Sequence, residues 1–156
     1  MAESARQYLT LGVSGQVFAA PVEQVSEIID LQPIAATPGG PPCLLGRVDL
    51  RREVVPVIDL RCALGLAPPP DDAHTRIVVV VASQGEGSRR VGVKTDRVYE
   101  VTALDDGSVE AAAPGTLGWH HEAVTGVGRR RGELLTLVDF MGIVEGVPSQ
   151  SAAPED

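Results

Sequence analysis

GRVDLRREVVPVIDL at Gly46–Leu60 aligns without a gap with GVGRRRGELLTLVDF at Gly126–Phe140. The offset is 80 residues, the difference between positions 126 and 46. Each stretch begins with glycine, carries charges in its middle, and continues into an apolar run with an aspartate near its end. Charged residues between two apolar segments are typical of a β-hairpin tip. Because self-similarity at a fixed spacing indicates repeated structural units, the sequence predicts two related hairpins in two related lobes.

A shorter repeated pattern precedes each of these glycines. Val25–Ile28 and Val98–Val101 share the pattern V-x-E-[IV]. Between the two halves lies Pro68–Asp72, whose three consecutive prolines stiffen the chain and cannot donate hydrogen bonds to a sheet. We therefore expect one domain over residues 7–146, made of two lobes divided near Pro68–Asp72, with flexible termini at residues 1–6 and 147–156.

Other segments predict short strands joined by tight turns. Hairpins are expected at Gln7–Ala20, around Ser14-Gly15, and at Arg76–Thr95. The apolar runs at Val54–Ile58 and Leu134–Val138 predict buried strands. Small units of short strands favour closed barrels, because closure removes exposed strand edges.

Two short helices are also predicted. Pro21 suits the first turn of a helix, and the apolar residues after it recur near helical spacing, which predicts a helix over Val22–Ile29. Asp59 is expected to cap a helical turn that ends at Gly65.

The net charge of -8 argues against nucleic acid as a partner, because phosphate binding needs a clustered positive surface. The only long basic run is Arg129–Arg131, which glycines flank on both sides. We interpret this run as an exposed hairpin tip. Other proteins are the expected partners.

The first residues, MAESARQY, lack the basic start and apolar stretch of a signal peptide, and the longest apolar run, Ile77–Ala82, is too short to cross a membrane. We therefore expect a cytoplasmic protein with no membrane insertion. Cys43 and Cys62 form no C-x-x-C motif and lie in or beside apolar segments. Buried free thiols are expected in a reducing compartment, and a disulfide is the alternative.

Motifs of catalysis are missing from the sequence. It contains no G-x-S-x-G, P-loop or H-E-x-x-H pattern. His120 and His121 have no other metal ligand at a useful spacing, so we interpret them as surface loop residues. Asp71-Asp72 and Asp105-Asp106 fall in polar loops, where a solvated charge is the ordinary state. We expect no enzymatic activity, no metal and no cofactor.

The motifs also stand in a specific order. QYLTLGV, PVEQVSEIIDL, GRVDLRREVVPVIDLRCALGL, TRIVVVVA, VGVKTDRVYEV and TGVGRRRGELLTLVDF follow one another over about Gln7–Val144. This series resembles the CheW-like domains of bacterial chemotaxis coupling proteins, and Gly46–Leu66 is its most specific part. The resemblance implies an all-β fold with short helices, in which two small SH3-like five-stranded β-barrels pack side by side.

The same resemblance implies a function. It is that of a non-enzymatic adaptor, which couples the cytoplasmic tip of a methyl-accepting chemotaxis receptor to a CheA-type histidine kinase at receptor arrays on the inner face of the membrane. Receptor tips in the family dock near the junction of the barrels. The residues carried over to that surface or its support are Val25, Glu27, Gly46, Arg51, Gly92, Val98 and Val101.

Several of these assignments have alternatives. Core packing is the alternative for Val98 and Val101. Val54 and Val57 are candidates for the kinase contact, with a buried strand as the alternative for both. We expect Glu27 and Arg51 to approach one another near the lobe junction, because they stand in the two family motifs and carry opposite charges.

One position departs from the family pattern. The family commonly has N-L-R-G where this chain has Asp49-Leu50-Arg51-Arg52. Arg52 replaces a glycine that allows positive φ, so the turn is expected to differ in shape and charge. This departure leaves room for a specialised scaffold of a motility or biofilm pathway. A small-ligand sensor that uses a cleft between the lobes is the alternative from another class.

Overall fold

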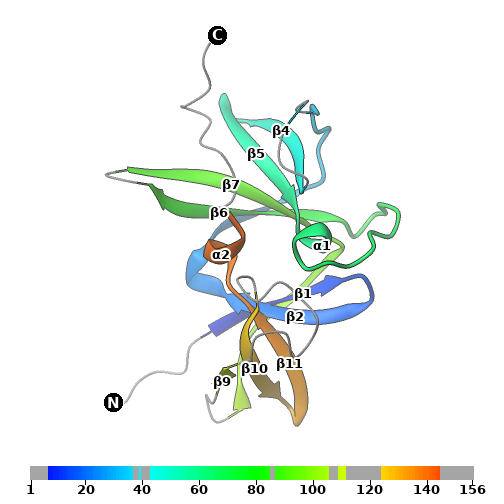
Figure 1. Ribbon diagram of the computed structural model, residues 1–156, viewed down its shortest axis with the longest axis vertical. Coiled ribbons are helices and arrows are strands. Elements are labelled where there is room, and N and C mark those ends of the chain that lie inside the picture. The colour runs from blue at the N-terminus through cyan, green and yellow to red at the C-terminus, as the bar shows by residue number, and fades with distance from the viewer. Residues whose placement is uncertain are drawn as a thin grey trace.

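The computed structural model describes residues 7–36, 39, 43–84, 87–105, 109–111 and 124–144. The predicted flexible termini, His120 and His121 lie outside the described residues. The described chain is mostly β, with short helices at η1 (Val22–Gln24), α1 (Leu60–Ala63) and α2 (Phe140–Val144). Its strands form two sheets, which lie one above the other in Figure 1 with α2 between them.

The first sheet has six strands in the order β8-β1-β2-β11-β10-β9. Their bounds are β8 (Arg97–Ala103), β1 (Gln7–Val13), β2 (Gln16–Pro21), β11 (Glu133–Val138), β10 (Val124–Arg130) and β9 (Val109–Ala111). The second sheet has five strands in the order β3-β6-β7-β5-β4. Their bounds are β3 (Val25–Asp30), β6 (Arg76–Gln84), β7 (Gly87–Thr95), β5 (Glu53–Asp59) and β4 (Leu44–Leu50). The predicted class of two small β lobes with short helices is confirmed, although the first lobe has an additional strand, β9.

The predicted boundary between the lobes is wrong. Pro68–Asp72 lies between α1 and β6, and the strands on both sides of it belong to the five-stranded sheet. The whole five-stranded sheet is inserted in the chain between β2 and β8, which both belong to the six-stranded sheet. The prolines therefore mark a connection inside one lobe, because a stiff segment without donors can end a strand without ending a domain.

The two lobes repeat the same pairing scheme. The strand order β8-β1-β2-β11-β10 matches β3-β6-β7-β5-β4 strand for strand. Gly46 pairs with Val57 beside a register shift, and Gly126 pairs with Leu137 beside the same shift. The 80-residue offset seen in the sequence is therefore an offset between equivalent positions in two sheets.

The two copies of the V-x-E-[IV] pattern lie in β3 and β8, which occupy equivalent places in the two sheets. In β3, Val25 and Glu27 flank a register shift against β6, and in β8 the register shifts against β1 over the matching residues. Val98 and Val101 pair with Leu11 and Leu9 of β1. The helix predicted over Val22–Ile29 is therefore wrong beyond its first turn. β-branched residues in this segment pair with β6, and its burial alternates along the strand as a half-buried strand requires.

Three apolar clusters explain why some strands are apolar on both faces. The side chains of Val78 and Val80 join a cluster shared by the two sheets, whereas Ile77 and Val79 point into the interior of the five-stranded lobe. Successive side chains of a strand point to opposite faces, so each face of β6 meets its own core. The third cluster fills the six-stranded lobe and contains Tyr8, Ala19, Leu104, Leu135 and Leu137.

Charged and polar contacts hold the lobes together around α1. Arg61 is 3% exposed, and its guanidinium contacts Asp59 at 2.5 Å and also Asp96 in the turn between β7 and β8. Asp96 in turn accepts a hydrogen bond from Ser14 N, in the β1–β2 turn of the other sheet, at 2.6 Å. Burial opposes the charge of Arg61, but its hydrogen bonds to the two aspartates outweigh this effect and raise its pKa.

Aspartates cap the helices α1 and α2, as the sequence predicts for Asp59. The Asp59 carboxylate accepts from Arg61 N, and its counterpart Asp139 accepts from Met141 N at the start of α2. Gln24 of η1 donates to Asp139 at 2.9 Å and accepts from Phe140 N at 3.1 Å. Because η1 leads into the five-stranded sheet and α2 follows the six-stranded one, these bonds fix α2 between the lobes.

Two sequence predictions about hairpins need correction. Arg51 and Arg52 both have positive φ, 51° and 71°, and their counterparts Arg131 and Gly132 have 55° and 83°. Arg52 therefore keeps the turn shape that glycine would give, and only the charge differs. In the strands after the turns, Val54 is 52% exposed and Leu134 is 62% exposed, whereas the other apolar residues of those runs at 55–58, 135, 137 and 138 are buried.

The cysteine prediction was also wrong. Cys43 and Cys62 form a disulfide, with their Cα atoms 5.4 Å apart. Both side chains are half-buried instead of fully buried. Neither the number nor the spacing of the cysteines reveals that the start of β4 and α1 meet in the folded chain.

Candidate functional site

Glu27 in β3 and Arg51 in the β4–β5 turn form an ion pair. The Arg51 guanidinium donates through Nη2 to Oε2 of Glu27 and through Nη1 to Oε1 at 3.4 Å. Two parallel contacts of this kind fix the relative orientation of a guanidinium and a carboxylate. The predicted approach of these two side chains is therefore confirmed.

The pair is exposed to solvent. The side chain of Arg51 is 64% exposed and that of Glu27 is 28% exposed. Its hydrogen bond to Arg51 lowers the pKa of Glu27, and the same bond raises the pKa of Arg51. Both groups therefore keep their charge at neutral pH. Because water screens such pairs, they add little to the free energy of unfolding, and the main effect here is on surface shape and charge.

The predicted place of this pair near the lobe junction is wrong. Glu27 and Arg51 both belong to the five-stranded lobe. Figure 1 shows the β4–β5 turn at the end of the hairpin that lies farther from the six-stranded sheet. The pair thus links two parts of a single lobe and faces outward from it.

A second ion pair extends the charged group. Arg90 of β7 donates to Glu53 of β5 at 2.6 Å, and both side chains are about 40% exposed. The charge of Arg90 also acts on Glu27, and the charge of Glu53 acts on Arg51. We call Glu27, Arg51, Glu53 and Arg90 the tip cluster. It joins β3, the β4–β5 turn, β5 and β7 through alternating charges.

Gly46 and Gly92 are closely packed positions of the same five-stranded sheet. A Cβ atom on Gly46 would lie 2.0 Å from the carbonyl oxygen of Ala35, and one on Gly92 would lie 2.8 Å from a methyl group of Ile77. Gly92 pairs with Val57 where β5 and β7 run parallel. Both glycines and the fully buried Val57 therefore serve close packing within the five-stranded sheet, and they present no side chain to a partner.

The remaining candidates differ in exposure. Val25 and Val98 occupy equivalent positions in β3 and β8, and both pack partly buried against the core shared by the lobes. Val101 and Val54 are about half exposed, at 50% and 52%. Of the candidates named from the sequence, the side chains open to a partner are therefore those of Glu27, Arg51, Val54 and Val101.

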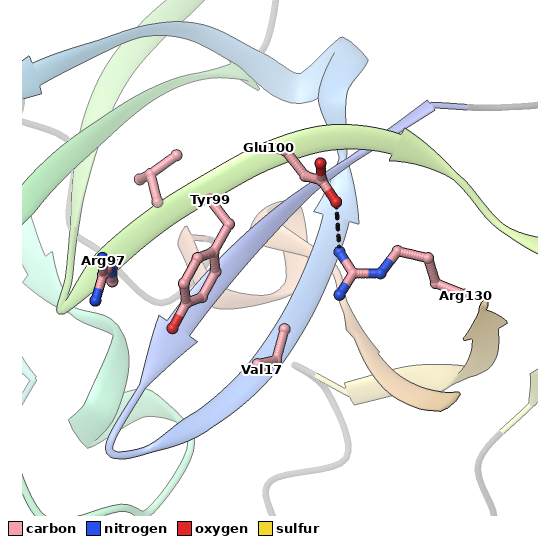
Figure 2. Close-up of a pocket in the computed structure, with 6 residues that line it drawn as sticks. Val17, Arg97, Tyr99, Glu100 and Arg130 are labelled. Carbon is pink, nitrogen blue, oxygen red and sulfur yellow. Dashed lines mark hydrogen bonds and ion pairs between the residues drawn. The ribbon is translucent and has the colours of Figure 1, made fainter. Parts of the chain in front are cut away.

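The six-stranded lobe carries a counterpart of this ion pair. Glu100, equivalent to Glu27 in the repeated pattern, accepts from Arg130 of β10 at 2.8 Å. The backbone of Glu100 exchanges two hydrogen bonds with the hydroxyl of Thr10, at 3.0 and 3.1 Å, which fix the register shift in β8. Figure 2 shows Glu100 and Arg130 beside Tyr99, Arg97 and Val17.

These side chains line a pocket of about 570 Å³, made by Val17, Arg97, Val98, Tyr99, Glu100 and Arg130. The guanidinium of Arg97 lies over the ring of Tyr99, 5.4 Å from its centroid, in a cation–π contact. Tyr99 is 50% exposed and Val17 is 37% exposed, so the pocket combines these two side chains with the charges of Arg97 and of the Glu100–Arg130 ion pair. The pocket lies within one lobe, among β2, β8 and β10, and not in a cleft between the lobes.

Sequence reasoning missed Arg97, Tyr99, Glu100 and Arg130. The repeat offered a signal for Glu100, because the V-x-E-[IV] pattern aligns it with Glu27. No such signal existed for Arg130, since the residue that aligns with Arg51 is Arg131, and the pairing depends on how β8 and β10 meet across the lobe.

Residues 7–147 of the chain match the family model described as CheW-like domain. The chain belongs to the CheW-like domain family. It is 29% identical over 143 residues to Chemotaxis protein CheW of Bacillus subtilis (strain 168), a match that covers 92% of this chain and 89% of that protein. It is 26% identical over 148 residues to Chemotaxis protein CheW of Rhizobium meliloti (strain 1021), covering 94% and 92%.

The fold of this CheW-like chain has a solved counterpart. The crystal structure of scaffolding protein TtCheW from Thermoanaerobacter tengcongensis aligns with a TM-score of 0.77 at 22% sequence identity, covering 88% of this chain and 86% of that one. Within the described residues, no helix is long and apolar enough to cross a membrane. The same part of the chain holds no cluster of His, Cys, Asp and Glu suited to a metal ion.

Proposed function

We propose that this CheW-like chain is a non-enzymatic adaptor that couples a methyl-accepting chemotaxis receptor to a CheA-type histidine kinase. It would act at receptor arrays on the inner face of the membrane. The proposal is supported by family membership over residues 7–147 and by the names of relatives that match nearly their whole length. The tip cluster around Glu27 and Arg51 is the observation that assigns the proposed docking surface to particular residues.

The tip cluster suits protein recognition for a physical reason. An exposed ion pair contributes little to folding, so its ordered geometry is available to a partner. Alternating charges across three strands and one turn would orient a docking protein and disfavour a partner with the wrong charge pattern. Half-exposed Val54, next to Glu53 in β5, adds apolar area at the same hairpin.

Arg51→Ala tests this assignment, with Arg131→Ala as its matched control. Both arginines occupy the first position of the equivalent hairpin turn and have similar φ, so the two variants remove the same side chain and charge. We expect Arg51→Ala to weaken binding to a purified receptor fragment or to the kinase regulatory domain about tenfold or more. Arg131→Ala should leave the binding affinity within about twofold of wild type. The corresponding change in binding free energy is well below the roughly 1.4 kcal/mol of a tenfold loss.

Two further measurements separate recognition from folding. The melting temperature of Arg51→Ala should fall by no more than about 2 to 4 °C, because water screens an exposed ion pair. Arg51→Lys should restore binding poorly, because lysine lacks the planar fork that meets both oxygens of Glu27. Wild-type binding of Arg51→Ala to both partners would refute the role of this residue.

The pocket of the six-stranded lobe favours a second candidate, a small-ligand sensor. Its lining of charged side chains around the Tyr99 ring would suit a small polar compound. An adaptor should co-elute with the kinase regulatory domain in size-exclusion chromatography. The melting temperature of a sensor should instead rise when a metabolite is added, because a ligand that binds only the folded state stabilises that state.

A further inference from the structure

The disulfide between Cys43 and Cys62 joins two structural elements at the base of the β4–β5 hairpin. Cys43 stands immediately before β4, and Cys62 lies in α1, which follows β5. The two cysteines are 19 residues apart in the sequence. The bond therefore closes a covalent ring around the whole hairpin, whose far end carries Arg51.

Neither Cys43 nor Cys62 is fully buried. Cys43 and Cys62 are half-buried, and neither belongs to any of the three apolar clusters. A thiolate attacks a disulfide along an open approach, so partial exposure favours exchange. Structural disulfides packed inside a core lack this access.

Other contacts would keep the two positions together after the bond is broken. Asp59 N donates to the carbonyl oxygen of Cys43 at 2.9 Å, next to the place where β5 ends. α1 retains its cap, because the Asp59 carboxylate accepts from Arg61 N at 2.9 Å. A reduced chain thus holds its thiols close enough to close the bond again, as a reversible site requires.

Neighbouring contacts connect the bond to the rest of the fold. Arg61 precedes Cys62 and makes the buried contact to Asp96, which binds the other lobe through Ser14. On the other side of the bond, β4 leads from Cys43 to the register shift at Gly46. Loss of the bond should therefore loosen the base of the β4–β5 hairpin beside the contacts that join the lobes.

We propose that Cys43 and Cys62 are a thiol–disulfide exchange site whose substrate is a dithiol reductant of the thioredoxin class. A thiolate of the reductant attacks one sulfur of the bond and releases the other cysteine as a thiolate, which takes up a proton. The second thiol of the reductant then displaces the remaining cysteine and closes the reductant's own disulfide. Two electrons and two protons pass to this chain, which gains two thiols, and the reductant is oxidised.

The reduced and oxidised chains should differ in stability. Cross-linking a ring of this size lowers the entropy of the unfolded chain, and the effect predicts a melting temperature about 6 to 12 °C lower after reduction. Amide hydrogen exchange should accelerate at Asp59. It should also accelerate at Ala35 and Arg47, which exchange two backbone hydrogen bonds near the base of the hairpin. Exchange in the paired centre of β6 and β7 should remain unchanged.

The test uses the full chain and reduced thioredoxin under native conditions, followed by alkylation and mass measurement. We expect no alkylation of the air-oxidised protein in denaturant, and two alkyl groups after native treatment with thioredoxin. Dithiothreitol should lower the melting temperature of wild type. The double variant Cys43→Ser/Cys62→Ser should have a melting temperature close to that of reduced wild type, and dithiothreitol should not change it.

Three results would overturn the proposal. The first is alkylation of both cysteines in the air-oxidised protein, which would show that the bond does not form. The second is a bond that survives native treatment with thioredoxin and is reduced by dithiothreitol only in denaturant, which would make it a purely structural link. The third is a melting temperature that reduction leaves unchanged or that dithiothreitol alters equally in the double variant.

Discussion

Replacement of Gly46 by alanine tests how the five-stranded lobe holds the base of its hairpin. Gly46 has φ +152°, a conformation that residues with a side chain rarely adopt. Its backbone passes the chain at Ala35 so closely that an added Cβ would lie 2.0 Å from the carbonyl oxygen and 2.7 Å from the carbonyl carbon. These are backbone atoms, so no rotation of a side chain can relieve the overlap.

The magnitude follows from the contacts that must break. Ala35 and Arg47 exchange two backbone hydrogen bonds of 2.9 Å, and moving the chain away from the new methyl group would lose both. Each bond is worth about 0.5 to 1.5 kcal/mol net, and the unfavourable φ costs about 1 to 2 kcal/mol. Gly46→Ala should therefore lower the free energy of unfolding by about 2 to 5 kcal/mol.

Gly132→Ala is the matched control. Gly132 also has positive φ, at 83°, but an added Cβ would meet no atom within 4 Å. Its variant should carry only the conformational cost, about 1 to 2 kcal/mol. Urea unfolding followed by far-ultraviolet circular dichroism gives both values by linear extrapolation. If Gly46→Ala costs no more than Gly132→Ala, the close approach to Ala35 does not matter, and the reasoning is refuted.

Three further outcomes are expected. Val57→Lys should cost about 3 kcal/mol or more because it buries an unpaired charge, whereas Val54→Lys, at a position 52% exposed, should change stability by about 0.5 kcal/mol or less, as urea unfolding would measure. Arg52→Gly should raise the free energy of unfolding by about 0.5 to 1 kcal/mol, because it relieves positive φ but makes the unfolded chain more flexible. Gly132→Arg should lower it by about 1 to 2 kcal/mol, the same conformational cost as Gly132→Ala, and no change in either variant in thermal melts would contradict the turn assignment. The pKa of the Glu27 carboxylate, measured by NMR, should lie below its ordinary value of 4.5 and should rise when Arg51 becomes alanine. Because the folded pKa is lowered, the contribution of this group to stability is complete above pH 4.5 and is lost as the pH falls through the lowered value.

The sequence by itself determined the local elements and the equivalence of the hairpins in its two halves. Hairpins could be predicted because apolar runs and turn residues are adjacent in the chain, and the turn at Ser14-Gly15 forms where it was expected. The 80-residue repeat identified equivalent hairpins, since both halves keep glycine, charge and apolar residues at the same spacing. The pairing of Glu27 with Arg51 followed from family motifs and opposite charge, and the ion pair is present.

Tertiary structure decided what depends on distant neighbours. Val25–Asp30 has apolar residues near helical spacing, yet it is a strand because β6 offers it a pairing edge. Pro68–Asp72 looks like a boundary, but strand pairing places both of its flanks in one sheet. The link between Cys43 and Cys62, the exposure of Val54, and the pairing of Glu100 with Arg130 all arise where separate segments meet. No pattern along the chain encodes these contacts, because burial and pairing are set by the packing of whole sheets.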